Sequence, residues 1–424
     1  MNKPITIAIV GLGSRGLDTY AACLERYPEQ AKIVAVADVN PERVRLAAQR
    51  YQIPAERCFD SGMALLDRER MADAIVLATP DACHHQEALA ALNKGYHLLL
   101  EKPVARTAAE CADIANLAQE KGLHVAVCHV LRYTVFYQQL KEIVDSGRIG
   151  EVVSVQAIER VGYWHQAHSF VRGNWHNKAK STPMILQKCC HDLDILLWLA
   201  GKRCERVSSF GSLTHFRPEN KPDGAPLRCV DGCPAAESCL YNAERFYLER
   251  LRRDGDSWPV NVLCSQPTEE KVRQALRSTD YGLCVYQCDN DVVDHQVVNM
   301  LLEGGVTVQL TMCAFTSSVS RSIRLMGTLG EVEGDMERNI IRVRPFGGEA
   351  EEIDVSSLMD DFSGHSGGDA RLVKDFLDLL TGEGQGMLTA VGQSVESHFA
   401  ALAAEESRLE NGRSIDIREF VRKG

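Results

Sequence analysis

The 424-residue sequence lacks any apolar run long enough to cross a membrane as a helix, which takes roughly 20 residues. It also lacks a basic excess, because 58 acidic against 47 basic residues give a formal net charge of −11. Such a charge repels phosphate backbones and anionic lipid, so neither nucleic acid nor a membrane is an expected partner. No signal-peptide pattern precedes the first apolar segment, and we therefore expect a cytoplasmic protein.

A disulfide framework is not expected either. The 15 cysteines are spread through a long chain without a leader, so most are predicted to be free thiols. Hydrophobic residues make up 45% and charged residues 25%, a balance typical of globular proteins and not of disordered ones. A chain of this length is too long for one ordinary core, which favours two domains.

The beginning of the chain has the order strand, glycine turn, helix, strand. Ile5–Val10 is a continuous apolar run, typical of a parallel strand buried on both faces. The segment Gly-Leu-Gly-Ser-Arg-Gly follows at 11–16, and Leu17–Tyr27 then has helical apolar spacing. A second apolar run, Ile33–Ala37, ends in Asp38.

Each part of this segment suits a dinucleotide. Gly11 permits the tight turn, Gly13 lets the backbone approach a pyrophosphate, and Gly16 lets the helix pack on its strand. Unpaired N–H groups at the helix start attract the phosphates. A carboxylate at Asp38 accepts ribose hydroxyls and repels a 2′-phosphate, which favours NAD, although Arg43 nearby leaves NADP as the alternative. Ser14 and Arg15 complete the cofactor contacts predicted in the turn.

Further apolar runs continue the alternation of strand and helix. They lie at Ala74–Ala78, His97–Leu100 and His124–Val127. Ligands of doubly wound sheets bind at the carboxyl ends of the strands, so cofactor contacts are expected just after these runs. The contacts predicted there are Thr79, Pro80, His84, Glu101 and Lys102.

Four segments together resemble the Gfo/Idh/MocA oxidoreductase family: the glycine turn, Ala78-Thr79-Pro80, Glu101-Lys102-Pro103 and His191-Asp192-Leu193-Asp194. The resemblance spans most of the chain. It implies an α/β protein with an N-terminal Rossmann dinucleotide-binding domain, followed by an α+β domain with a large open, mainly antiparallel sheet. It also implies NAD-linked chemistry on a sugar, cyclitol or polyol carbinol, and a homo-oligomer, dimer or tetramer.

The second half of the chain agrees with this expectation, because it is rich in short β-like runs separated by turns. These runs are Val152–Ile158, Val207–Ser212, Asp294–Leu302, Thr307–Ala314, Arg321–Met326, Glu331–Glu333 and Ile340–Val343. Helical stretches at Asp369–Leu380 and Ala390–Glu410 are expected to cover the sheet. We place the Rossmann domain at 1–128 and the substrate-binding and oligomerisation domain at 129–424, with a cysteine-rich insertion around 216–290.

Three residues are the predicted catalytic groups. The Lys102 ammonium, just beyond a strand, is suited to stabilise a developing alkoxide or to join a proton relay. The His191 imidazole titrates near neutral pH and suits removal of a hydroxyl proton. Asp194 lies three positions further along a predicted helix over Ile185–Ala200, where it is expected to orient His191 or bind a substrate hydroxyl.

The sequence departs from the family at one position. Many members carry an aspartate four residues before this histidine, whereas Gln187 stands here, followed by Lys188. An uncharged amide is not a general base, so the family's Asp–His–Lys triad is not carried over whole. Gln187 and Lys188 are predicted substrate contacts instead, with plain helix-face positions as the alternative.

A stretch rich in rings and hydrogen-bond donors follows the first domain. Aromatic faces stack on the C–H faces of pyranose rings, which favours a carbohydrate pocket over one for a small aliphatic acid. A structured loop with incidental aromatics is the alternative. The predicted substrate contacts are Tyr163, Trp164, His165 and Trp175, together with Arg132 and Tyr133.

Cys229, Cys233 and Cys239 form a compact cluster in the insertion, and Cys284 lies downstream. Four thiolates suit a structural Zn²⁺ or an iron–sulfur centre, with zinc the simpler choice. The spacing does not match paired CxxC motifs, and buried free thiols are the alternative.

The sequence thus predicts NAD-dependent oxidation of a secondary hydroxyl of a sugar, glycoside or cyclitol by hydride transfer, with pyranoside C3 as the leading position. One alternative is a glycosidase that uses NAD transiently, in an oxidation and elimination cycle. The other is a non-catalytic NAD- or sugar-binding sensor, which Gln187 in place of the aspartate keeps open.

Overall fold

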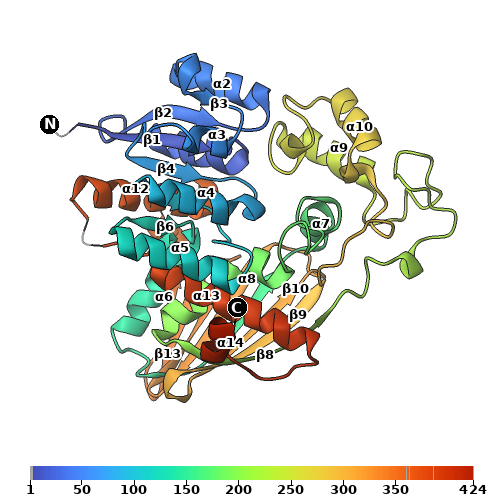
Figure 1. Cartoon of the computed structure of the whole chain (residues 1–424). Coiled ribbons are helices and arrows are strands. Elements are labelled where there is room, and N and C mark those ends of the chain that lie inside the picture. The colour runs from blue at the N-terminus through green and yellow to red at the C-terminus, as the bar shows by residue number, and fades with distance from the viewer. Residues whose placement is uncertain (1–2, 360, 362, 385, 424) are drawn as a thin grey trace.

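The computed structural model describes residues 3–359, 361, 363–384 and 386–423. Within these residues the chain forms two β-sheets with helices on and between them (Figure 1). The N-terminal sheet is parallel, and the C-terminal sheet is mixed and mainly antiparallel. The predicted fold class is confirmed.

The parallel sheet has the strand order β3-β2-β1-β4-β5-β6. This order reverses between β1 and β4, the position at which doubly wound sheets bind nucleotides. The last four residues of β1 are buried, as expected for a central strand covered on both faces. The strands are β1 (Ile5–Val10), β2 (Ala31–Ala37), β3 (Cys58–Phe59), β4 (Ala74–Leu77), β5 (His97–Leu100) and β6 (Val125–Val127).

The helices of this domain begin at residues suited to cap them. Asn40 accepts a hydrogen bond from the Glu42 amide at the start of α2 (Pro41–Tyr51). Thr107 and Glu110 form a capping box at the start of α5 (Ala108–Lys121). The helix after the glycine turn starts as π-helical turns rather than α-helix. The remaining elements are η1 (Ser14–Ala21), α1 (Ala22–Leu24), η2 (Ala55–Arg57), α3 (Gly62–Leu66) and α4 (Asp81–Asn93).

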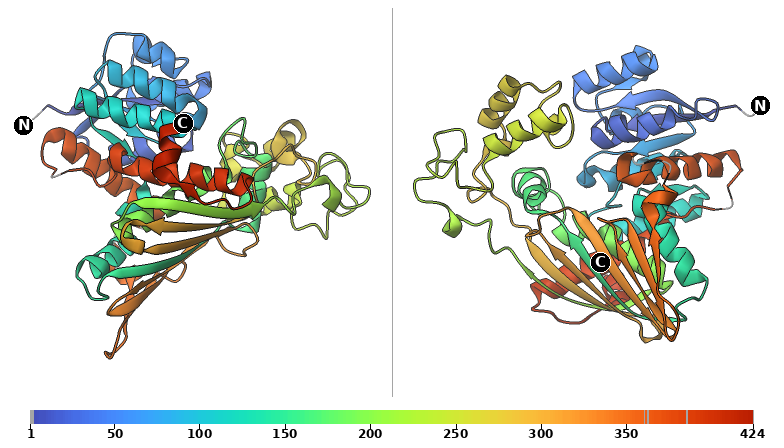
Figure 2. Two further views of the ribbon diagram at one scale, coloured as in Figure 1. Left: turned by 60° about the horizontal axis from the view of Figure 1, so that its bottom comes forward. Right: turned by 180° about the vertical axis from the view of Figure 1, so that it is seen from behind.

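The second sheet has the order β14-β13-β12-β11-β7-β10-β9-β8-β15. Within this sheet, β7 and β10 are the only described strands that pair in parallel. Buried and exposed residues alternate along β10, so one face packs on helices and the other faces outward. The right-hand view of Figure 2 shows this outer face in front of the helices. The strands are β7 (Val152–Arg160), β8 (Cys204–Ser212), β9 (His295–Leu302), β10 (Thr307–Cys313), β11 (Ser320–Gly327), β12 (Gly330–Asp335), β13 (Ile340–Pro345), β14 (Glu351–Asp354) and β15 (Ile415–Asp416).

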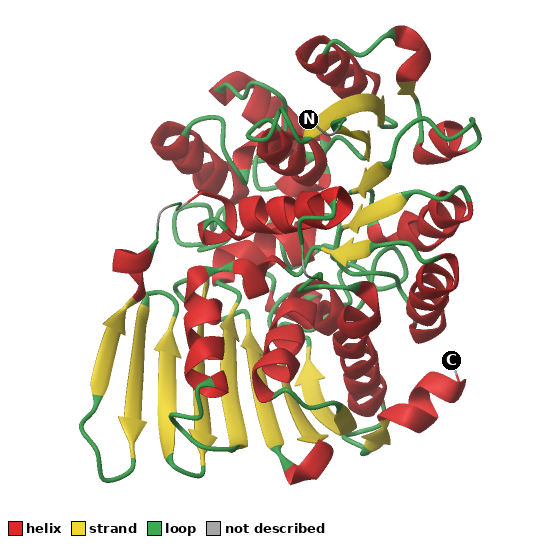
Figure 3. Cartoon of the chain, turned by 90° about the vertical axis from the view of Figure 1, so that its left-hand side faces the viewer, coloured by secondary structure: helices red, strands yellow, loops and turns green. Residues whose placement is uncertain are grey.

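Two long helices connect the sheets (Figures 1 and 3). The first, α8 (Met184–Ala200), packs on β7 and β10, and the second, α13 (Val391–Leu409), contacts α5, α8 and β8. A third helix, α12 (Gly368–Thr381), shares a hydrophobic core with β1 and β2. Elements near the end of the chain therefore complete the first domain, and the boundary at residue 128 stays a prediction.

The insertion contains two helices, α9 (Ala243–Asp254) and α10 (Glu269–Ser278), joined by loops and short turns. It projects to one side of the molecule, near α7 (Tyr163–His165) (Figure 1). The other short elements are η3 (Val130–Tyr133), α6 (Val135–Asp145), η4 (Gln166–Arg172), η5 (Pro218–Asn220), η6 (Val260–Val262), η7 (Asp280–Gly282), η8 (Glu303–Gly305), η9 (Val355–Leu358), α11 (Ser363–Ser366) and α14 (Ile417–Lys423). No described helix combines the length and apolarity of a membrane span.

The sequence prediction omits three short strands. β3 and β15 have two residues each, and β14 consists of Glu-Glu-Ile-Asp, so none offers an apolar run. They form because the neighbouring strand has unpaired backbone N–H and C=O groups at its edge. Another segment can pair with these groups whatever side chains it carries.

A buried ion pair joins η3 to α8. The Arg132 guanidinium donates from Nε and Nη2 to the two carboxylate oxygens of Asp194, at 2.7 and 2.6 Å. Both side chains are at most 5% exposed. Burial alone would raise the pKa of Asp194, but His129 and Arg132 lower it to about 2. The pair fixes α8 against the end of the first domain.

We expect Arg132→Met to lower the free energy of unfolding at pH 7 by about 3–5 kcal/mol, because it leaves the Asp194 charge buried without its main partner. A group whose folded pKa is depressed stabilises above its ordinary pKa, 3.8 for aspartate, and this contribution disappears as the pH falls through the folded value near 2. The difference between variant and wild type in urea denaturation should therefore shrink from pH 4 towards pH 2. Arg45→Met is the control, since Arg45 pairs with Glu42 on an exposed helix face. Equal losses in both variants would contradict the argument.

Candidate functional site

The glycine turn leaves β1 in a conformation that only glycine allows. Gly11 has φ +88°, and a Cβ placed on it would lie 2.5 Å from the carbonyl of Ala78. A Cβ on Gly16 would lie 1.8 Å from the Gly11 oxygen. At Gly13 the nearest atom to such a Cβ is 3.9 Å away, on Arg43. Two glycines are thus required by packing, and the third leaves the open space that a pyrophosphate needs.

Asp38 ties β2 to this turn. Its carboxylate accepts hydrogen bonds from the backbone amides of Leu12, at 2.6 Å, and Asn40, at 2.8 Å. The Arg43 guanidinium lies 3.8 Å from the same carboxylate and is half-exposed. Each carboxylate oxygen has a second lone pair, so the predicted ribose contact fits this geometry. Arg43 occupies the position from which it would also meet a 2′-phosphate.

Arg15 and Glu101, both predicted cofactor contacts, bind each other. The Arg15 Nε lies 2.6 Å from Glu101 Oε1, and its Nη2 lies 2.7 Å from Asp369 on α12. Tyr20 and the Lys102 amide also donate to the Glu101 carboxylate, at 2.6 and 2.8 Å. Burial opposes its ionisation, yet the Arg15 and Lys102 charges hold the pKa of Glu101 below the ordinary value. These residues support the loops around the site.

The loop after β4 is braced in a similar way. Thr79 donates to Glu87 on α4 at 2.6 Å. The ring nitrogens of the buried His84 face the carbonyl oxygens of Pro103, at 2.8 Å, and Thr79, at 2.9 Å. His84 therefore joins the loops after β4 and β5 through both nitrogens. This geometry contradicts its predicted role as a side-chain contact to the cofactor.

Lys102 reaches across the domain boundary to α8. Its ammonium donates to the backbone oxygen of Gln187 at 3.0 Å, and the Gln187 amide oxygen lies at 3.5 Å. The amide nitrogen of Gln187 lies 3.4 Å from the carboxylate of Asp81. The same carboxylate accepts a hydrogen bond of 2.7 Å from the Ser181 hydroxyl. Asp81 was not among the predicted site residues, although it follows Thr79-Pro80 at a strand end. The structure thus supplies a carboxylate next to the position where the family aspartate is missing.

His191 lies one turn further along α8 and is buried. No hydrogen-bond partner is present for its Nδ1. Burial, followed by the charge of Lys102 and the neighbouring His129, lowers the pKa of His191 well below its ordinary value. The ring is therefore neutral at pH 7, with one nitrogen ready to accept a proton. The charge of Lys102 thus acts on His191, and the joint catalytic role of the two residues stays a prediction.

Asp194 does not orient His191. Its carboxylate is taken by Arg132, and its Oδ1 lies 2.9 Å from His129 Nδ1. The predicted pairing of Asp194 with His191 is wrong, because a shared helix face does not decide which partner the rest of the fold places opposite it.

Arg132 and Tyr133 do not reach the site either. Tyr133 donates to Asp375 on α12 at 2.6 Å. Both residues line a cavity of about 1000 Å³ that neither Lys102 nor His191 lines. Their predicted role as substrate contacts at the hydride-transfer site is wrong.

Lys188 is committed to a buried carboxylate. Its ammonium lies 2.9 Å from Glu159 on β7, which also lies 2.9 Å from the guanidinium of Arg321. Arg321 in turn contacts Asp192 at 2.7 Å. Burial raises the pKa of Glu159, while Arg321 and Lys188 oppose that shift. The predicted substrate contact of Lys188 is replaced by this network.

The aromatic segment packs mainly against the insertion. The Arg250 guanidinium lies 4.3 Å from the Trp164 ring centre, and the Trp258 ring lies 5.4 Å from that ring. Trp175 is 36% exposed and packs on Phe170. Tyr163 is half-buried, with its ring 6.2 Å from that of Tyr241 in the insertion. These contacts leave only parts of the rings for a ligand.

His165 is the member of that segment whose surroundings point to the site. Its Nδ1 is buried without a partner. Burial, then the charge of Lys188 and, more weakly, that of Lys102, lower its pKa well below the ordinary value. The charges of the lysines on α8 and after β5 thus act on His165.

The four predicted metal ligands line one small cavity, of about 10 Å³, in the insertion. Arg172 holds its wall through hydrogen bonds to the backbone oxygens of Leu283 and Tyr241, both at 2.7 Å, and lies 3.7 Å from the Cys229 sulfur. The thiols are not drawn into a compact ligand set. Among the described residues, the one group of three or more such atoms within 4.8 Å of one another lies elsewhere.

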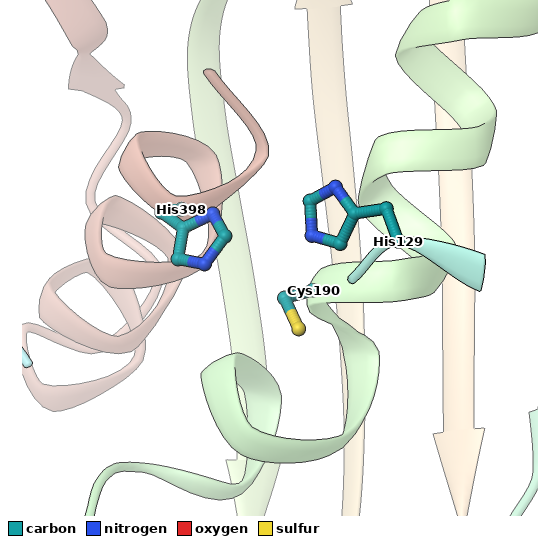
Figure 4. Close-up of side chains that lie close together, drawn as sticks. All are labelled: His129, Cys190 and His398. Atoms are coloured by element: carbon teal, nitrogen blue, oxygen red, sulfur yellow. The ribbon is translucent and has the colours of Figure 1, made fainter. Parts of the chain in front are cut away.

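That group consists of His129, Cys190 on α8 and His398 on α13 (Figure 4). Both nitrogens of His398 already have partners, since Nδ1 faces the Ser394 oxygen at 3.0 Å and Nε2 accepts from the Val104 amide at 2.9 Å. Burial raises the pKa of the Cys190 thiol to about 12, which disfavours the thiolate that a metal requires. The group is a packing cluster that borders His191, whose ring lies 5.6 Å from that of His129.

Comparisons with known proteins agree with this geometry. A family model described as "Oxidoreductase family, NAD-binding Rossmann fold" matches residues 5–129, and its C-terminal alpha/beta domain model matches residues 141–412. The putative oxidoreductase YteT of Bacillus subtilis is 23% identical over 425 residues, which cover 92% of this chain and 94% of that protein. The inositol 2-dehydrogenase of Pseudomonas fluorescens is 31% identical over 197 residues, which cover 46% of this chain and only 54% of the enzyme.

Solved structures share the fold at low identity. An oxidoreductase from Agrobacterium radiobacter, in complex with NAD+, L-tartaric acid and magnesium, has a TM-score of 0.70 at 15% identity, covering 98% of this chain and 99% of that one. The WlbA dehydrogenase of Bordetella pertussis, in complex with NADH and UDP-GlcNAcA, has a TM-score of 0.66 at 17% identity, covering 97% and 98%. Since the two family models together match most of the sequence, the chain belongs to the Gfo/Idh/MocA family of oxidoreductases with an NAD-binding Rossmann fold.

Proposed function

We propose that this protein is an NAD-dependent dehydrogenase that oxidises a secondary hydroxyl of a sugar, glycoside or cyclitol, with pyranoside C3 as the leading position. The observation that carries the proposal is a lysine ammonium at the carboxyl edge of the parallel sheet, held against Gln187 on α8 one turn before a neutral, buried imidazole. The names of its relatives support the substrate class, since several are inositol 2-dehydrogenases and one structure holds a nucleotide sugar.

The chain offers a fitting place for the cofactor. Gly13 leaves open space at the turn, and Asp38 has lone pairs directed beside it. When bound there, NAD+ supplies the hydride acceptor. His191 takes the hydroxyl proton on its neutral imidazole. Lys102 donates to the same oxygen and stabilises its developing negative charge. Gln187 and Asp81 hold the ammonium in position and offer further hydrogen bonds to substrate hydroxyls.

The test is a panel of glycosides, free sugars and cyclitols supplied with NAD+ and followed at once for NADH and for bond cleavage. We expect net NADH formation with at least one member. Cleavage of a glycoside without net NADH would favour the glycosidase that uses NAD transiently. Tight NAD binding with no turnover on any member would favour a sensor.

A variant connects this activity to the site. Lys102→Met should bind NAD as wild type does and lose turnover by on the order of 10²–10⁴-fold. Lys94→Met, at the end of α4, is the control and should keep full turnover. Undiminished turnover in Lys102→Met would remove Lys102 from the mechanism.

The protonation of His191 yields a separate prediction. Because burial and the Lys102 charge lower the pKa of His191, the imidazole should stay neutral in wild type to well below pH 6.5, the ordinary value. Removing the cation in Lys102→Met should move the NMR titration of His191 to higher pH. An unchanged midpoint would mean that the Lys102 charge does not act on the imidazole.

We also propose a structural Zn²⁺ at Cys229, Cys233, Cys239 and Cys284. These thiols line one cavity, but no three of their sulfurs lie within 4.8 Å of one another, so a metal would have to draw them together to the tetrahedral distance of about 2.3 Å. Metal analysis of the purified protein should find close to one zinc per chain, lost in Cys233→Ser but kept in Cys264→Ser. Iron in place of zinc would favour the iron–sulfur alternative, and metal-free wild type would mean free thiols.

A further inference from the structure

The segment before α12 has an unusual backbone. His365 and Ser366 have positive φ angles, 46° and 54°, and Gly367 follows at 79°. Residues other than glycine seldom adopt this left-handed conformation, which costs of order 1–3 kcal/mol each. Strain of this kind persists where the surrounding structure enforces it, and such positions cluster at functional sites.

This turn brings His365 to the site. Its ring centre lies 6.4 Å from that of His191. The two side chains differ sharply in accessibility, because His191 is buried whereas the side chain of His365 is 42% exposed. The charge of His365 is among those that disfavour protonation of His191, which agrees with their proximity. His365 therefore lies between the buried imidazole and solvent.

A carboxylate fixes the His365 ring. Its Nδ1 lies 2.9 Å from Asp369 Oδ2, and the other oxygen of Asp369 lies 2.7 Å from Arg15. Burial opposes ionisation of Asp369, but Arg15 and His365 hold its pKa far below the ordinary value, so it remains a carboxylate. An acceptor at Nδ1 keeps the proton on that nitrogen and the lone pair on Nε2. Asp369 thus orients an imidazole that can accept a proton at Nε2.

We propose that His365, oriented by Asp369, relays the proton of the oxidised hydroxyl from His191 to solvent. This inference rests on the proposed function. The need for it follows from burial: His191 takes a proton in every turnover, and its own surroundings disfavour keeping it. With 6.4 Å between the ring centres, one bridging water would connect the two imidazoles.

The relay balances the reaction. The hydroxyl O–H bond breaks and its proton passes to the His191 imidazole, while the C–H hydride reduces NAD+ to NADH and the carbinol becomes a ketone. The proton then moves through water to His365 Nε2 and from there to bulk solvent. One proton is released for each NADH, and both imidazoles return to the neutral form.

The test is chemical rescue of His365→Ala. We expect the steady-state rate of NADH formation to fall on the order of 10²-fold, because His191 must lose its proton before each new turnover, while NAD affinity and thermal stability stay at wild-type values. Added imidazole should restore the rate in proportion to its concentration, because a small base can then carry the proton. The wild-type rate should not depend on imidazole.

His85→Ala is the matched control, since His85 also pairs with a carboxylate, Asp113, at 3.1 Å on an exposed helix face. It should neither slow NADH formation nor respond to imidazole. A wild-type rate in His365→Ala, or a loss that imidazole does not restore, would overturn the relay. An inactive wild type on the whole substrate panel would instead reject the proposed function, so the two failures are distinguishable.

Discussion

The buried ion network of Arg15, Glu101 and Asp369 is the constraint on which the site depends. Its members come from the glycine turn, the loop after β5 and α12, which are far apart in the sequence. A guanidinium between two carboxylates compensates charges that would be costly to bury singly. Glu101 accepts a hydrogen bond from the backbone amide of Lys102, and Asp369 binds the His365 ring. The network therefore fixes the positions of Lys102 and His365.

Charge balance around α8 then determines protonation. Burial, followed by the charge of Lys102, lowers the pKa of His191, so the imidazole is held neutral. The carboxylates on the same helix are compensated separately, Asp194 by Arg132 and Asp192 by Arg321. An uncharged Gln187 beside Lys102 fits this balance, because its amide offers both a donor and an acceptor between the ammonium and Asp81.

The insertion has a different relation to the site. It covers the segment after β7 by stacking rings on Trp164 and by a hydrogen bond of 2.7 Å between Tyr247 and His168. Rings that the sequence suggests for sugar binding are thereby partly used in packing. His165, in this segment, has an unpartnered buried nitrogen, and the charges of Lys188 and Lys102 act on its ring.

Much of the fold and part of the site could be predicted from the sequence. The glycine turn, the apolar runs of both sheets and α8 are local patterns, and a run such as Ile5–Val10 is buried wherever a central strand forms. Short edge strands without apolar runs, such as β14, escaped because backbone pairing alone forms them. The meeting of Lys102 with the His191 region followed from the family resemblance and agrees with the structure.

By itself the sequence determined the order of most strands and helices and the dinucleotide turn, and it supplied the groups that we propose for the chemistry. Only the tertiary structure decided their partners: Asp194 with Arg132 rather than His191, Arg15 with Glu101, and His365 beside His191. Helical spacing tells which side chains share a face. The element that packs against that face is decided by contacts between residues that lie 62 to 354 positions apart in the sequence. Those contacts depend on how α8 and α12 dock, which no local pattern encodes.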